Sequence, residues 1–276
     1  MERKEALSVS ADLYSRTHEA LTASDPDHKV ELTQALRADW LAGRLRLDLA
    51  AANPQSIGAP GRPLKPELVA PRDLVKRQLS TRIGRAALIH AIAHIEFNAI
   101  NLALDAVYRF RQLPADYYGD WLLVADEEAK HFLMLRERLQ ALGYNYGDFP
   151  AHNGLWEMAE DTAHDHMVRM ALVPRVLEAR GLDVTPGMLE RLRAADDLTT
   201  VAILEVILKE EIGHVAIGSR WFKYACAQRG LDPEPTFREL LGRYMRGRLQ
   251  GPFNTNARMA AGFSAAELAA LKELEL

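Results

Sequence analysis

Apolar residues recur along most of this chain at the three-to-four-residue period of an amphipathic α-helix. No stretch combines alternating β-branched residues with turn signals. Helix start and stop signals divide the periodic sequence into four long helices, predicted over residues 81–110, 114–143, 153–180 and 197–229. The pattern therefore predicts an all-α fold with a four-helix bundle at its centre.

Two further helices are predicted before the bundle. Ser10-Ala-Asp12 opens the first, which fades near Pro26, and Asp27 opens the second. The expected apolar stripe of the second helix is Val30, Leu32, Leu36, Trp40, Leu41, Leu45 and Leu49. Five prolines between positions 53 and 71 forbid a regular helix, so we expect an ordered loop wrapped over the bundle.

The C-terminal region reads as further helices separated by turns. A helix is expected from Asp232 to about Tyr244, followed by Gly-Pro and Asn-Thr-Asn turn chemistry. Ser264 with Glu267 three residues later is a capping box, which predicts the start of a last helix.

At 276 residues the chain approaches the size at which a single core stops growing. We therefore expect one compact unit with three regions. These are N-terminal helices and the proline-rich loop in 1–80, the four-helix bundle in 81–230, and a C-terminal helical extension in 231–276.

Composition narrows the functional classes. The formal net charge is −4, with 34 Lys and Arg scattered among 38 Asp and Glu, so the chain carries no overall electrostatic sign of nucleic-acid binding. Cys226 is the only cysteine, which excludes an intramolecular disulfide and favours a reducing compartment. No apolar signal region or run of about 18 apolar residues stands out, so we expect a cytoplasmic protein without a membrane span.

One chemical pattern occurs twice in the predicted bundle. In each copy a lone glutamate is followed, 32 or 33 residues later, by a Glu-x-x-His sequence, and the second copy is the first displaced by 82 or 83 positions. The two sets are Glu96, Glu128 and His131, then Glu178, Glu211 and His214. The period indicates two helix pairs related by an approximate two-fold.

These residue types at this spacing suit a pair of metal ions. Residues three apart on a helix face the same way, so each Glu-x-x-His sequence presents a carboxylate and an imidazole together. Four carboxylates and two imidazoles on four helices form the ligand set of a carboxylate-bridged two-metal site. Oxygen-rich ligands with one imidazole per metal favour iron, with manganese possible, over structural zinc. The adjacent Glu127 and Glu210 point about 100° away and are interpreted as supporting or surface groups.

A single Glu-x-x-His in a helical protein is usually only a surface pair. The plain alternative for the doubled pattern is a duplicated, salt-bridged bundle that holds no metal. Against this, burying a carboxylate without a cation costs folding free energy on the order of several kcal/mol. The glutamates also sit on apolar helix faces, where unliganded glutamate is uncommon.

Pro174 lies inside the third predicted helix, four residues before Glu178, and should kink it. The kink either opens a path beside the metals or only bends the helix around its neighbours. Arg175 and Arg180 flank Glu178, where they would steady its carboxylate, bind an anionic substrate or lie on the surface.

Several other polar residues invite a functional reading. His94 is interpreted as a core or supporting histidine, and His164 as a possible pocket residue. His166 is expected to be solvated, and Asp165 with Arg169 to form a surface ion pair.

The order Glu96, Glu128-x-x-His131, Glu178, Glu211-x-x-His214 resembles the di-iron ligand order of the ferritin-like superfamily. A closer resemblance is to an uncharacterised bacterial family of about this length, a ferritin-like domain of unknown function. It extends from the N-terminal helices to about residue 250. The stretches that carry it start at His94, Asp126, Arg169 and Lys209.

The resemblance implies a ferritin-like four-helix bundle that holds two metals, usually iron. Broader relatives include ferroxidases, desaturases, rubrerythrin-like peroxidases and, as more distant kin, a di-iron tRNA-modifying hydroxylase. We therefore expect a di-iron or Mn/Fe oxidoreductase, an O₂-dependent hydroxylase or oxidase acting on a small or RNA-attached substrate. The alternative is a ferroxidase-type iron-handling protein without organic substrate, and a third reading is a purely structural bundle. No Cys-x-x-Cys pair is present, so an external electron donor is expected, and a dimer is possible.

Overall fold

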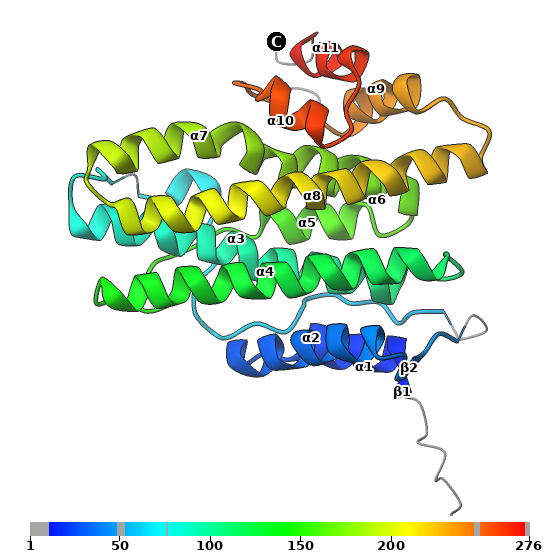
Figure 1. The fold of residues 1–276 in the computed structure, drawn as a ribbon, viewed down its shortest axis with the longest axis horizontal. Coiled ribbons are helices and arrows are strands. Elements are labelled where there is room, and N and C mark those ends of the chain that lie inside the picture. The colour runs from blue at the N-terminus through cyan, green and yellow to red at the C-terminus, as the bar shows by residue number, and fades with distance from the viewer. Residues whose placement is uncertain (1–10, 49–52, 76, 246–248, 274–276) are drawn as a thin grey trace, which may run out of the picture. The chain divides into compact units, whose positions relative to one another are not determined.

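The computed structural model describes residues 11–48, 53–75, 77–245 and 249–273. It is built of α-helices, which confirms the all-α class (Figure 1). The only strands in these residues are β1 (Ala11–Asp12) and β2 (Leu45–Arg46), a two-residue parallel pair that the sequence pattern did not predict.

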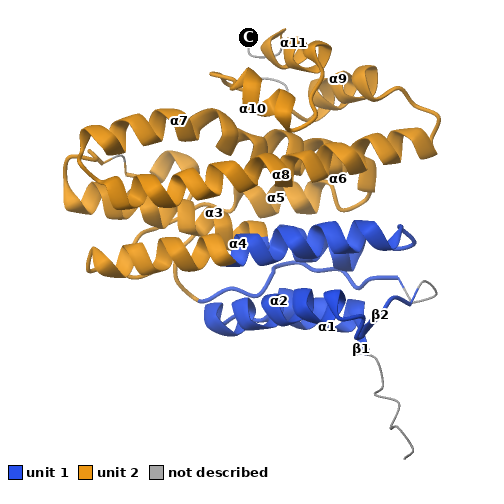
Figure 2. Cartoon of the chain, viewed as in Figure 1, with its two compact units in different colours: residues 1–63, 100–129 blue, residues 64–99, 130–276 orange. Residues whose placement is uncertain are grey.

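The chain divides into two compact units (Figure 2). Unit 1 consists of residues 1–63 and 100–129, and unit 2 of residues 64–99 and 130–276. The boundary runs through two unbroken helices, α3 (Arg82–Arg109) and α4 (Ala115–Ala141). The predicted division at residues 80 and 230 stays a prediction.

Unit 1 contains α1 (Leu13–Thr22) and α2 (Pro26–Leu41). The side chain of Asp12 caps α1, as expected. Asp25 rather than Asp27 caps α2, because Pro26 takes the first helical position, where a missing N–H costs nothing. The expected apolar stripe of α2 ends early.

Val30 and Leu36 of that stripe are buried, but Leu41 is 69% exposed, Leu45 lies in β2, and Leu49 lies outside the described residues. The stripe instead includes Lys29, whose Nζ donates hydrogen bonds of 2.8 Å to the carbonyl oxygens of Ala20 and Leu21. The buried Lys29 of α2 therefore binds the carbonyl oxygens at the end of α1, a role that a count of hydrophobic residues overlooks.

The proline-rich segment 53–71 forms no α-helix, as predicted, and its backbone is bonded at separate points. Gly61 N donates to Leu21 O within unit 1. In unit 2, Val69 N donates to Ala151 O at 2.8 Å and Ala151 N to Glu67 O at 2.9 Å. A short 3₁₀ helix, η1 (Pro71–Asp73), follows.

Helices α3 and α4 and helix α8 (Leu198–Gln228) begin and end within a few residues of the predicted positions. Helix α3 is long and apolar enough to cross a membrane, but 78% of its most apolar window is buried in the protein, as in the core helix of a soluble protein. Asp197 caps α8 through Thr200 N and also accepts a 2.8 Å hydrogen bond from Arg138 of α4. One carboxylate thus fixes the start of α8 and ties it to α4.

The expected third helix is wrong as a single element. Residues 153–194 form α5 (Gly154–Asp161), α6 (His166–Leu172), the π-helix η2 (Val173–Glu178) and α7 (Ala179–Ala194). Asp165 restarts the helix by capping α6 at Met167 N. The helix also continues past its predicted end at residue 180, because Gly181 and Pro186 both lie inside α7.

Pro174 distorts the helix as predicted, and the distortion is the π-helix η2. Proline lacks the N–H that an α-helix needs at that position, so the turn widens. The proline ring packs directly on Gly218 of α8: a Cβ at Gly218 would overlap Pro174 Cβ and lie 2.5 Å from its Cγ. Glycine at 218 therefore permits the close approach of η2 to α8.

The C-terminal region forms α9 (Pro233–Tyr244), α10 (Thr255–Ala260) and α11 (Ala265–Glu273). Asp232 caps α9 and the predicted capping box is confirmed, with Ser264 N donating to Glu267 at 2.9 Å and Glu267 N to Ser264 Oγ at 3.1 Å. The Asn-Thr-Asn sequence was expected to be a turn. Instead, Asn254 caps the short helix α10.

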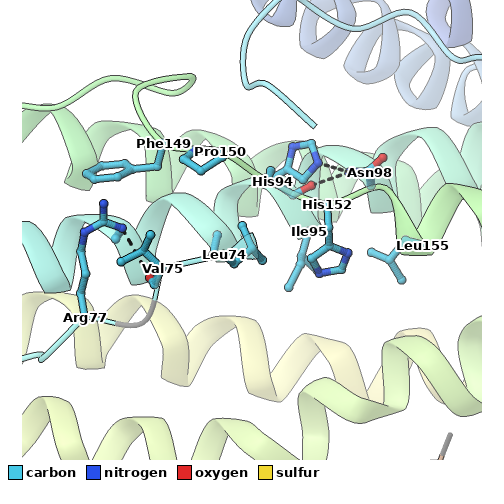
Figure 3. Close-up of a pocket in the computed structure, with 13 residues that line it drawn as sticks. Leu74, Val75, Arg77, His94, Ile95, Asn98, Phe149, Pro150, His152 and Leu155 are labelled. Atoms are coloured by element: carbon cyan, nitrogen blue, oxygen red, sulfur yellow. Dashed lines mark hydrogen bonds between the residues drawn. The ribbon is translucent and has the colours of Figure 1, made fainter. Parts of the chain in front are cut away.

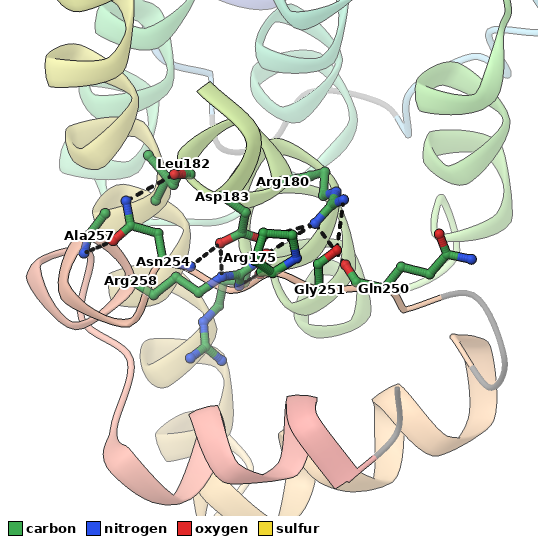
Figure 4. A network of polar contacts seen from close by, with 10 residues as sticks. Arg175, Arg180, Leu182, Asp183, Gln250, Gly251, Asn254, Ala257 and Arg258 are labelled. Atoms are coloured by element: carbon green, nitrogen blue, oxygen red, sulfur yellow. Dashed lines mark hydrogen bonds and ion pairs between the residues drawn. The ribbon is translucent and has the colours of Figure 1, made fainter. Parts of the chain in front are cut away.

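A buried polar network joins the C-terminal helices to η2 and α7 (Figure 4). Arg258 makes two hydrogen bonds to Asp183, of 2.9 and 2.7 Å, and a third of 3.3 Å to the carbonyl of Arg175. Arg175 forms a fully buried 2.7 Å ion pair with Glu267. The bidentate geometry suits arginine and lysine could not reproduce it.

We predict opposite effects for two glycine substitutions in α8. Gly218→Ala should destabilise the protein by about 1–3 kcal/mol, because the new methyl group overlaps Pro174. Gly213→Ala meets nothing within 4 Å, so it should stabilise the helix by up to about 1 kcal/mol. Chemical denaturation of the metal-free variants measures both, and equal stability of the two proteins would contradict the proposed contact.

A second prediction concerns pH. Burial lowers the pKa of His90 from 6.5 to about 4, opposed weakly by Asp148, and Gly147 N donates to its Nε2 at 2.9 Å. The folded state prefers neutral His90, so this stabilisation is complete above pH 6.5 and is lost as pH falls toward 4. The loss amounts to about 3 kcal/mol in total at 1.36 kcal/mol per pKa unit.

Denaturation at pH 7.5 and pH 4.5 tests this prediction. His90→Gln should lose clearly less stability than wild type over this interval, while the exposed control His28→Gln should match wild type. Identical pH dependence of all three proteins would refute the assignment.

Candidate metal centre

The six predicted ligands come from four helical segments. Glu96 lies on α3, Glu128 and His131 on α4, Glu178 at the end of η2, and Glu211 and His214 on α8. All are buried in the structure except Glu178, which is half-buried. Buried carboxylates on apolar helices need a compensating charge.

Within unit 2, Glu96, His131 and Glu211 offer ligand atoms that lie within 4.8 Å of one another. Glu128 precedes His131 by one turn of the unbroken helix α4 and offers a carboxylate oxygen to the same group. Three carboxylates and one imidazole thus form a buried cluster that could hold a metal ion. Glu178 and His214 are not members of this cluster in the described residues.

His131 lies between two carboxylates. Its Nδ1 is 3.2 Å from Glu96 Oε2, and its Nε2 is 2.7 Å from Glu210 Oε2. Nδ1 therefore faces the cluster, while Nε2 faces outward to Glu210. A ligating histidine commonly donates its second ring N–H to a carboxylate in this way, which fixes the ring and raises its basicity.

Glu210 also contacts Lys130, at 2.7 Å from Oε1 and 2.6 Å from Oε2. Partial burial opposes its ionisation, but the hydrogen bonds from Lys130 and His131 bring the pKa of Glu210 below its usual value. Glu210 is therefore the carboxylate that orients His131. The sequence left open whether Glu210 is a supporting group or a surface group. Its contact with His131 makes it a supporting group.

His214 lies beside the cluster. Its Nδ1 is 3.4 Å from Glu211 Oε1, and its ring centroid is 5.8 Å from that of His131. Glu178 follows Pro174 by four residues, and His214 precedes Gly218 by four residues. The contact between Pro174 and Gly218 therefore fixes the position of η2, which carries Glu178, along α8.

Both arginines beside Glu178 make contacts that hold the fold together. Arg175 is fully buried against Glu267 and donates to Ser219 Oγ at 3.2 Å. Arg180 donates to the carbonyl oxygens of residues 250–252. The surface reading of Arg175 is wrong, because the pairing with Glu267 makes its burial possible.

The structure also changes three expectations for residues 164–169. His166 is half-buried instead of fully solvated, and its burial lowers its pKa to about 4. Asp165 pairs with Arg229 through two 2.8 Å hydrogen bonds, while Arg169 is 1% exposed, so no surface pair of the expected kind forms. His164 is exposed and lies 3.4 Å from Tyr244 Oη.

His94 is a core residue, as interpreted. Asn98 Nδ2 donates to its Nε2 at 3.0 Å, so its Nδ1–H donates to Tyr146 Oη at 2.8 Å. Tyr146 also packs against Phe97 and Phe132 with ring centroids 5.6 and 5.1 Å away. Tyr146 lies in a turn between helices, and no periodic signal could have identified it.

The donor set fits a hard metal ion. Carboxylate oxygens with imidazole and no thiolate suit iron or manganese, and the single cysteine is not among the ligands. A cation would also offset the three carboxylates gathered in the cluster.

The comparisons identify the family. The family described as "Protein of unknown function (DUF455)" matches residues 22–269. The chain belongs to this family. A relative from Haemophilus influenzae, described as an uncharacterized protein, is 47% identical over 273 residues. The match covers 95% of this chain and 94% of the relative. No solved structure matches the chain.

We predict that Glu210→Gln weakens metal binding about tenfold or more, because His131 loses its charged hydrogen-bond acceptor. Glu205→Gln is the matched control, since Glu205 lies on the same helix, is half-exposed and pairs with Arg193. Anaerobic Fe(II) titration against a chromophoric chelator gives the affinity, and thermal unfolding checks the fold. Equal affinities of the two variants would contradict the role of Glu210.

Proposed function

We propose that this protein is a di-metal carboxylate oxidoreductase of the ferritin-like superfamily that uses O₂ to hydroxylate or oxidise a substrate. The observation that carries the proposal is the buried cluster of Glu96, Glu128, His131 and Glu211. It is supported by the sequence pattern, because each cluster residue belongs to one of two sets repeated at 82 or 83 positions. Two sets suit two metal ions, most simply iron.

In this proposal each half of the repeat holds one ion. Glu96, Glu128 and His131 form one half, and Glu178, Glu211 and His214 the other. When bound, two iron ions supply the chemistry of O₂ reduction, which protein side chains alone do not provide.

The chain's own residues supply placement and exclusion of water. Glu210 holds the ring of His131 with its Nδ1 toward the cluster. Buried apolar residues of α3 around Glu96, including Ile92 and Ala99, keep the surroundings of the carboxylates dry. A dry, preorganised site strengthens the interaction of carboxylates with a cation and protects reactive species from water.

The electron source and the substrate are proposed from chemistry. Cys226, the only cysteine, is buried and its pKa is raised by burial to about 11, so it offers no redox pair. Electrons therefore come from a separate protein or small reductant. A small or RNA-attached substrate and a cytoplasmic location remain part of this proposal.

Metal analysis tests the centre itself. Protein loaded anaerobically with Fe(II) should hold two iron ions per chain, and the double variant Glu96→Ala/Glu211→Ala should hold fewer than one. Removal of the metal should lower the melting temperature of wild type and leave the double variant unchanged, because only a folded site stabilises by binding. Less than one iron per wild-type chain would overturn the centre.

Oxygen uptake tests the reaction. The reduced, iron-loaded protein should consume O₂ faster when a substrate is present, with one oxidised product per turnover. Full-rate oxidation without substrate, together with iron accumulation beyond two ions per chain, would replace this proposal by an iron-handling function.

A further inference from the structure

A separate pocket of about 150 Å³ lies in unit 2, beside α3 (Figure 3). Three parts of the chain surround it: residues 74, 75 and 77, the α3 face that includes Ala87 and Ala91, and residues 149–152 with Leu155. Glu96 is two residues from both His94 and Asn98, which is about 200° around a helix, so the pocket and the carboxylate point to different sides of α3. The pocket is therefore not part of the candidate metal centre.

The walls of the pocket are fixed by hydrogen bonds. Ala151 is held on both sides of its peptide by the backbone bonds to Glu67 and Val69. His94 is held between Asn98 and Tyr146. A preformed wall lowers the entropic cost of binding a ligand.

The pocket wall leaves large apolar side chains uncovered. Val75 is 63% exposed and Ile95 is 43% exposed, and both line the pocket. Ala87 and Ala91, one turn apart on α3, make the wall concave because they are small. A cavity of about 150 Å³ lined by apolar side chains accommodates a benzene ring. The apolar part of a ligand is therefore limited to about one six-membered ring.

Arg77 determines the charge that the pocket prefers. It is the one arginine or lysine among the described lining residues, and none of those residues is an aspartate or glutamate. Its guanidinium lies 5.3 Å from the ring of Phe149. In the described part of the chain its only hydrogen bond is a long 3.5 Å contact with Val75 O.

A guanidinium carries five N–H donors, so Arg77 has most of them available to an anion. Planar carboxylates match its geometry bidentately. Figure 3 shows Arg77 and Phe149 at one end of the pocket, with Ile95 and His152 toward the other. A ring between these ends would place a carboxylate substituent at Arg77.

From this arrangement we propose that the pocket binds a small aromatic monocarboxylate, with the carboxylate at Arg77 and the ring against Ala91 and Ile95. Benzoate is the simplest member of the class. The proposal stands independently of the metal centre, because the pocket shares no ligand with it.

Saturation-transfer NMR with benzoate, followed by calorimetric titration, tests the proposal on the full-length protein. Benzoate should bind wild type, and benzylammonium, which has the same ring and the opposite charge, should bind at least tenfold more weakly. Arg77→Gln should weaken benzoate at least tenfold, and Ala91→Leu should abolish binding by filling the pocket.

Two matched controls locate the binding. Arg72→Gln removes an exposed arginine five residues from Arg77, and Ala202→Leu enlarges an exposed alanine on another long helix. Both should bind benzoate as wild type does, and thermal unfolding should show that all four variants are folded. Absence of saturation transfer with wild type, equal binding of benzylammonium, or unchanged binding in both Arg77→Gln and Ala91→Leu would overturn the proposal.

Discussion

The burial of acidic side chains among apolar helices is the constraint on which the centre of this protein depends. Glu96, Glu128 and Glu211 each replace a residue that could have packed as a hydrophobe, and they converge within a few ångströms of one another and of His131. Like charges at that separation in a poorly solvated interior repel strongly. A bound cation would resolve the conflict, and the ring of His131 gives Glu96 a hydrogen-bonding partner at the same place.

The same constraint explains why the surrounding structure is so closely tied together. A cluster of ligands works only when its members are held within fractions of an ångström. Asp197 ties the start of α8 to α4, Glu210 fixes the ring of His131, and Gly218 lets Pro174 approach α8. Each contact limits the sliding or rotation of an element that carries a predicted ligand.

The C-terminal helices extend this support to η2. The carbonyl of Arg175 lies in the widened turn and accepts a hydrogen bond from Arg258, while the Arg175 side chain pairs with Glu267. The aromatic rings of Phe222, Phe237 and Phe263 surround its guanidinium at 4.2 to 4.8 Å. A buried cation in an aromatic cage with one carboxylate partner can hold a helix end in place without exposure to water.

The sequence by itself determined the helical class, the limits of α3, α4 and α8, the capping box at Ser264 and the candidate ligands. These features are local: a helix period, a cap or an i, i+3 pair depends on neighbours a few residues away. Only the tertiary structure decided that Pro174 widens a turn into a π-helix, that Arg175 points to Glu267, and that Glu210 contacts His131. It also left the apolar residues Ile83 and Ile95 of α3 partly exposed. Periodicity identifies an apolar face but not what covers it, because the partner of a side chain far along the sequence is set by packing.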